Sequence, residues 1–152
     1  MTAIANLLLR DARPDNQAHL LLWDTPNPFE LDQIARYNNA QRVNYRDNLL
    51  QRTRPDAKSL TLHHRVDNGE EMAAIKSICE QAVKPVVLLE GLDCLITYLN
   101  VHPGDYITLF WSSLENTRKL QSLLWIILPY KLVPQTWSET RLIRIPSYTH
   151  TH

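Results

Sequence analysis

The chain of 152 residues has 44% hydrophobic and 21% charged residues, proportions that exclude a disordered or fibrous chain. Its length suits one domain around one core, and we place a single α/β domain at residues 1–148, followed by a flexible tail at 149–152. Sixteen basic and sixteen acidic residues give a formal net charge of zero, which excludes a strong overall attraction to nucleic acid or to anionic lipid. The same balance leaves little repulsion between copies of the chain.

The sequence also lacks the pattern of a targeting or membrane segment. The apolar run at residues 4–9, interrupted by Asn6, is too short for a signal peptide and has no basic start. No stretch approaches the ~20 apolar residues that span a membrane. We therefore expect a cytoplasmic protein without membrane contact. Cys79 and Cys94 lie in apolar surroundings and are expected to be buried thiols.

Apolar runs alternate with stretches of helical spacing along the chain. Continuous runs such as HLLLW (19–23), VVLL (86–89) and LWIIL (124–128) are typical of buried strands. In chain order we expect a helix at 3–10, a strand at 19–23, a helix at 29–37, a strand at 42–45, a helical turn at 47–52, a strand at 60–66, a helix at 70–82, a strand at 86–89, helices at 93–99 and 106–121, and strands at 124–128 and 141–145.

This alternation predicts how the elements assemble. Strands separated by helices form βαβ crossovers, so we expect an α/β three-layer sandwich with a mainly parallel central sheet. VVLL lies between two helical stretches and is expected to be a central, parallel strand. RLIRI (141–145) alternates arginine with apolar residues and is expected to be an edge strand. Asp93 is expected to be the N-cap of the helix that follows it.

Function in an open parallel sheet lies beyond the carboxyl ends of the strands. Here HLLLW is followed by DTPNPFEL (24–31), VVLL by EGLD (90–93), and LWIIL by PYK (129–131). This order resembles the core of P-loop ATPases of the RecA or AAA type. In that family an early strand leads into a phosphate-binding loop, a middle strand ends in a carboxylate that handles magnesium and water, and a later strand ends in a polar sensor residue. The resemblance spans roughly residues 20–145 and implies a P-loop-like topology.

The phosphate-binding loop departs from the family at each chemical position. The motif GxxxxGK[ST] needs glycines so that backbone amides can wrap phosphate, a lysine for the terminal phosphates and a hydroxyl for magnesium. At those positions the chain carries Asp24, Phe29, Glu30 and Leu31. Pro26 and Pro28 remove further amide donors. We therefore expect no ATP binding and no cofactor, only a vestigial nucleotide cleft at Asp24, Glu30, Glu90 and Asp93.

Other kinds of site find little support in the pattern. His63 and His64 are adjacent, so on a strand they would point to opposite faces, and no HxxxH or HExxH motif is present. No nucleophile motif such as GxSxG occurs. We expect no metal site and no catalytic residue, although an unrecognised enzyme with Glu90 and Asp93 in its cleft stays open as an alternative.

The C-terminal third combines tryptophan, tyrosine and basic residues, which are typical of interface hot spots. The candidate interface residues are Trp111, Arg118, Trp125, Tyr130, Lys131, Trp137, Arg141 and Arg144. The sequence thus predicts a non-catalytic scaffold or adaptor subunit of a larger assembly that contacts a protein partner or self-associates. The alternative is a nucleic-acid-associated subunit of a DNA-transaction or phage-defence complex, because arginine beside aromatic rings also suits single strands.

Overall fold

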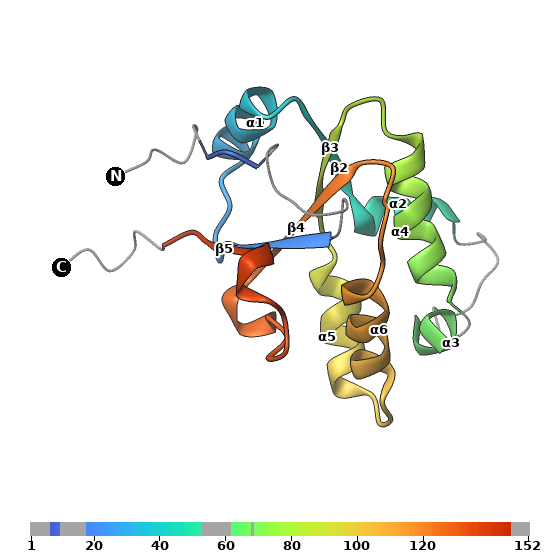
Figure 1. The fold of residues 1–152 in the computed structure, drawn as a ribbon. Coiled ribbons are helices and arrows are strands. Elements are labelled where there is room, and N and C mark those ends of the chain that lie inside the picture. Colours follow the sequence, from blue (N-terminus) through green and yellow to red (C-terminus); the bar gives the residue numbers. More distant parts are fainter. Residues whose placement is uncertain (1–6, 10–17, 53–61, 68, 147–152) are drawn as a thin grey trace.

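The computed structural model describes residues 7–9, 18–52, 62–67 and 69–146, and its centre is one parallel sheet (Figure 1). The strands lie in the order β2-β3-β4-β1-β5, and each neighbouring pair is parallel. Their bounds are β1 (Ala18–Leu22), β2 (Ala40–Asn44), β3 (Val86–Glu90), β4 (Leu123–Leu128) and β5 (Leu142–Arg144). The expected α/β fold with a parallel sheet is confirmed. As expected, β3 lies inside the sheet and β5 at an edge.

Helices connect the strands and cover both faces of the sheet. They are α1 (Pro28–Tyr37), α2 (Tyr45–Arg52), α3 (Leu62–Asp67), α4 (Glu70–Gln81), α5 (Asp93–Val101) and α6 (Tyr106–Glu115), with short 3-10 helices η2 (Tyr130–Leu132) and η3 (Glu139–Arg141). Within the described residues, no helix has the length and apolar character needed to cross a membrane.

Alternation along the strands divides the core into two layers. In β4, Leu124, Ile126 and Leu128 belong to a larger cluster that includes side chains of α2, α4, α5 and α6. Leu123, Trp125 and Ile127 point the other way and pack with α1. Figure 1 shows this arrangement, with α1 on one side of the sheet and α4, α5 and α6 on the other. The result is a three-layer sandwich with unequal outer layers.

Three expected elements differ from the structure. Residues 62–67 of the predicted strand at 60–66 form α3, and residues 60 and 61 lie outside the described part. Helix α6 ends at Glu115 rather than at residue 121, because the Thr117 hydroxyl bonds the Ser113 carbonyl and Lys119 takes a left-handed φ of 58°. At the N-terminus, residues 7–9 are not helical, and the rest of the expected helix at 3–10 lies outside the described residues.

Candidate functional site

The carboxyl ends of the strands form a cleft of about 230 Å³, which we call the strand-end cleft. Ligands bind at this edge in open parallel sheets. Its lining consists of Trp23, Asp24, Pro26, Asn44, Glu90, Gly91, Asp93, Ile127 and Pro129. The structure therefore brings together Asp24, which follows β1, with Glu90 and Asp93, which lie on either side of the turn between β3 and α5. Glu30 lies on α1 and is not part of the lining.

Arg42 of β2 holds both oxygens of the Glu90 carboxylate. Its Nε donates to Oε2 at 2.8 Å and its Nη2 donates to Oε1 at 3.1 Å. The remaining Nη1 donates to Asp32 of α1 at 2.7 Å. The hydrogen bond to Glu90 is the main cause that raises the pKa of Arg42, against the opposing effect of burial. Glu90 thus belongs to an ion-pair chain that ties β3 to β2 and α1.

The carboxylate of Asp24 is also bonded within the protein. Its Oδ1 accepts the backbone N–H of Tyr130 at 2.8 Å. Asp24 follows β1 and Tyr130 follows β4, and these two strands are neighbours in the sheet. The bond therefore fastens the loop after β1 to the end of β4.

The N-terminus of α1 follows the loop where the family resemblance would place phosphate. Asn27 caps this helix, and its Oδ1 accepts the N–H groups of Phe29 at 2.8 Å and Glu30 at 3.3 Å. The Leu31 N–H donates to the Asn27 carbonyl at 2.9 Å, and Pro28 has no N–H group. The amides of the first turn are therefore satisfied by the helix's own cap.

The turn after β3 lies close to the start of α2. Gly91 has a φ of 82°, a conformation that favours glycine, and a Cβ there would lie 2.9 Å from Asn44 Oδ1 and 3.2 Å from the Arg46 nitrogen. The same Asn44 oxygen accepts the Asp47 N–H at 3.0 Å. Asp93 is the first residue of α5, with Leu92 at the N-cap position, so the expected capping role of Asp93 is wrong.

Half of the candidate interface residues belong to the protein interior. Trp111, Trp125 and Trp137 are buried, and so is Arg141. The indole N–H of Trp137 donates to the Arg141 carbonyl at 3.1 Å, and that of Trp125 donates to the Leu9 carbonyl at 3.1 Å. These four residues therefore form part of the core rather than a contact surface.

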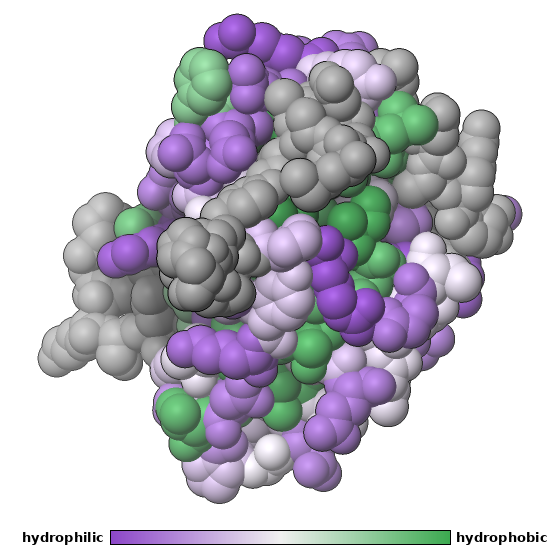
Figure 2. All heavy atoms as spheres, turned by 90° about the vertical axis from the view of Figure 1, so that its left-hand side faces the viewer, coloured by the Kyte–Doolittle hydropathy of each residue, from purple (hydrophilic) through white to green (hydrophobic). Residues whose placement is uncertain are grey.

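The other four candidate residues reach the surface. Arg118, Lys131 and Arg144 are exposed, and Tyr130 is partly exposed. The Tyr130 hydroxyl donates to the Ile145 carbonyl at 2.6 Å, and Arg144 pairs with Glu139 at 2.9 Å. Figure 2 shows the side of the molecule on which β5 lies, where hydrophobic side chains lie among hydrophilic ones.

A buried charge cluster on α4 was not predicted from the sequence. The Glu71 carboxylate is fully buried and accepts hydrogen bonds from Tyr45, Arg52 and Arg65. Burial alone would raise the pKa of Glu71, but hydrogen bonds from Arg52, Tyr45 and Arg65 bring it below its usual value. The cluster fastens α2 and α3 to α4. The sequence contained one indication of this burial. Glu71 precedes the apolar Ile75 by four residues, so both lie on the same face of the helix.

The two cysteines differ in burial, although the sequence predicts that both are buried. Cys79 is buried, and this burial raises the pKa of its thiol to about 12, whereas Cys94 is half-buried; both are free thiols. Within the part of the chain that the structure describes, no three His, Cys, Asp or Glu side chains are placed to hold a metal ion.

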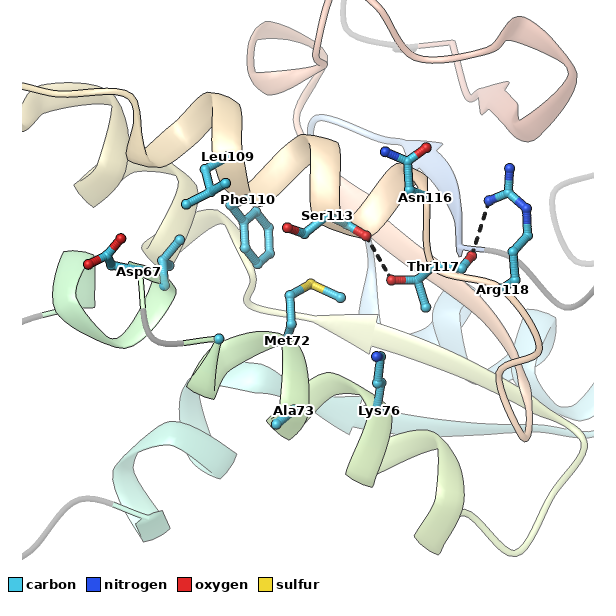
Figure 3. Close-up of a pocket in the computed structure, with 12 residues that line it drawn as sticks. Asp67, Met72, Ala73, Lys76, Leu109, Phe110, Ser113, Asn116, Thr117 and Arg118 are labelled. Atoms are coloured by element: carbon cyan, nitrogen blue, oxygen red, sulfur yellow. Dashed lines mark hydrogen bonds between the residues drawn. The ribbon is translucent and has the colours of Figure 1, made fainter.

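A second hollow, which we call the α4–α6 groove, lies between these two helices and has a volume of about 600 Å³ (Figure 3). Met72 and Phe110 lie between the helices, Asp67 lies at one end, and Lys76 and Arg118 lie towards the other. The full lining is Val66, Asp67, Gly69, Met72, Ala73, Lys76, Leu109, Phe110, Ser113, Asn116, Thr117 and Arg118. Of these residues, only Arg118 was a candidate from the sequence.

Comparison with known proteins gave no match to a family model, to a curated protein or to a solved structure.

Proposed function

We propose that the chain is a non-catalytic α/β scaffold or adaptor subunit of a larger assembly, related in pattern to RecA- and AAA-type ATPases but without ATP binding. The α1 N-terminus carries this proposal. Phosphate binds at helix N-termini through free backbone N–H groups. Here the Asn27 side chain accepts the N–H groups of Phe29 and Glu30, and Pro28 has no N–H group.

The charges in the strand-end cleft support the same conclusion. The described lining contains Asp24, Glu90 and Asp93 but no lysine or arginine. Two like charges 4 Å apart repel by about 1 kcal/mol in water and by about 4 kcal/mol at the effective dielectric near a protein surface. A triphosphate in this cleft would meet such repulsion from Asp24 and Asp93, and no lysine or arginine of the described lining would offset it. Glu90 is in addition paired with Arg42, which also argues against a catalytic role for its carboxylate.

The topology supports a relationship in pattern. β4 lies between β1 and β3, so the loops that would hold phosphate, magnesium and sensor residues in the resemblance meet at one edge of the sheet. The order β2-β3-β4-β1-β5 differs from the 3-2-1-4-5-6 order of Rossmann folds and from the 2-1-3-4-5 order of flavodoxin-like folds.

Calorimetry with ATP and Mg²⁺ tests the proposal. Titration into the purified chain should give no saturable heat beyond dilution. A saturable isotherm with a micromolar dissociation constant, which corresponds to about −8 kcal/mol, would overturn the proposal.

The nucleic-acid alternative is a second candidate because Arg118, Lys119 and Lys131 are exposed cations. Fewer aromatic rings are exposed for base stacking than the sequence suggested, since Trp111 and Trp137 are buried. Fluorescence polarisation with a labelled single-stranded oligonucleotide at several salt concentrations separates the two candidates. Binding that falls steeply with salt would favour the nucleic-acid subunit, and no binding at low salt would favour the scaffold.

A further inference from the structure

The middle of the α4–α6 groove is apolar. Met72 of α4 and Phe110 of α6 lie between the two helices, and Val66 of α3 also lines the groove (Figure 3). Leu109, also on α6, is 44% exposed, although a side chain of this kind is stabilised by leaving water. The volume of about 600 Å³ lies within the ~300–1,000 Å³ range of ligand sites.

One end of this groove is basic. Lys76 and Arg118 line both the groove and an adjoining hollow of about 130 Å³, whose lining also includes Lys119 and Glu80. This adjoining hollow is therefore lined by three cations and by a single carboxylate, that of Glu80. None of the three forms an ion pair with a carboxylate of the described residues. The basic end thus has charge available for an anionic partner.

The chain after α6 positions Arg118 and gives Lys119 an unusual backbone conformation. Thr117 Oγ1 donates to the Ser113 carbonyl at 2.7 Å, and Arg118 Nη1 donates to the Glu115 carbonyl at 2.9 Å. Lys119 has a φ of 58°, which is uncommon for a residue with a side chain. Such conformations persist where the surrounding structure determines them, and they concentrate at functional sites.

Charge and shape together select one kind of occupant. The groove has Asp67 at one end and Lys76 with Arg118 towards the other, so a segment lying along it is oriented by its own charges. Amphipathic helices lay their apolar face into such grooves between helices. A nucleic acid would need exposed rings for stacking, but Phe110 is buried.

We propose that the α4–α6 groove is the docking site for an acidic, amphipathic peptide segment of a protein partner. Its apolar side chains enter the groove, and its carboxylates pair with Lys76, Arg118 and Lys119. The inference rests on the proposed scaffold function and names the chemistry of the partner.

Selection from a displayed library of random peptides against the full chain tests this proposal. Enriched peptides should combine apolar and acidic residues. By fluorescence polarisation, Lys76→Glu/Arg118→Glu should weaken their binding about tenfold or more. The matched control Arg36→Glu/Lys84→Glu changes the net charge equally at two exposed positions outside the groove and should leave binding unchanged.

A separate variant tests the apolar contacts of the groove. Leu109→Ser alters an exposed side chain, so the fold should persist, and peptide binding should fall several-fold. The proposal is overturned if no peptide is enriched, if the enriched peptides lack acidic residues, or if the groove variants bind them as well as the wild type. These outcomes concern the groove alone, because a scaffold could use another surface, whereas saturable ATP binding would overturn the scaffold function itself.

Discussion

The strand-end cleft and the α4–α6 groove differ in how their charged groups are used. In the cleft, both Glu90 oxygens accept bonds from Arg42, and Asp24 accepts the Tyr130 N–H. In the groove, Lys76 and Arg118 have no carboxylate partner among the described residues, and apolar side chains lie between the helices. A position favoured by topology thus marks where a ligand can bind, whereas the bonds already made there determine how much charge and hydrogen-bonding capacity is left for one.

The largest expected effect concerns Glu71, which holds the helix that forms one wall of the groove. Glu71→Ala leaves Arg52 and Arg65 without their buried partner and should lower the free energy of unfolding by about 3 kcal/mol. The matched control is Glu70→Ala, because the half-exposed Glu70 pairs with Arg65 at 3.2 Å and should contribute less than about 1 kcal/mol. Urea unfolding measures both. Equal losses would mean that the buried cluster does not anchor α4.

A loss of similar size is expected for Leu88→Ala, in the strand β3 that ends in Glu90 of the cleft. Leu88 is fully buried against the α1 layer, and its truncation should destabilise the fold by about 2–5 kcal/mol. The exposed Leu109→Ala serves as the control and should change stability by about 0.5 kcal/mol or less. If the two variants unfold at the same urea concentration, then β3 is not an interior strand.

Acid should remove part of the Glu71 contribution. The pKa of this carboxyl in the folded chain lies below its usual value of 4.5, so its stabilisation is complete above that pH and is lost as the pH falls through the folded-state pKa. The effect should be smaller than that of Glu71→Ala because protonation keeps the side chain in place. Urea unfolding of the wild type and Glu71→Gln from neutral to acidic pH should show their stability difference shrinking. A difference that stays constant would contradict the expected ionisation.

The smallest expected effect belongs to the ion pair of the cleft. Arg42 and Glu90 side chains are 29% and 21% exposed, so Arg42→Ala should cost about 1 kcal/mol through loss of the bonds to Glu90 and Asp32. Arg144→Ala removes a pair whose side chains are 52% and 69% exposed and should have almost no effect. Thermal unfolding of the two variants distinguishes them. An Arg42→Ala variant as stable as the wild type would mean that the bonds between Arg42 and Glu90 do not stabilise the fold.

The sheet could be predicted because its strands carry local signals. VVLL and LWIIL are continuous apolar runs, and the structure buries all four residues of the first and all five of the second. α3 carries no comparable signal, since the two apolar residues of LHHRVD, Leu62 and Val66, are four apart and share one face in a helix or in a strand. Its position depends on Arg65 bonding Glu71 of the next helix and on Val66 packing into the larger cluster, and such tertiary contacts override local preference.

The candidate site could be predicted in part. Asp24, Glu90 and Asp93 converge because parallel strands end at one edge. Their partners could not be predicted, since Arg42 reaches Glu90 only through the register of β2 against β3. The burial of Trp137 likewise depends on an edge-to-face contact with Trp111 in α6, a residue distant in sequence. Composition alone could not separate such core rings from interface rings.

The central claim is that polar groups of the strand-end cleft are bonded within the protein and that the cleft does not bind nucleotide. Amide NMR spectra of the isotope-labelled chain, titrated with ATP and Mg²⁺, test this claim most directly. The amides of Phe29 and Glu30 report on the capped α1 N-terminus, and those of Gly91 and Tyr130 report on the ends of β3 and β4. None of these four signals should move as nucleotide is added. Saturable shifts confined to these amides would show a working nucleotide site and contradict the claim.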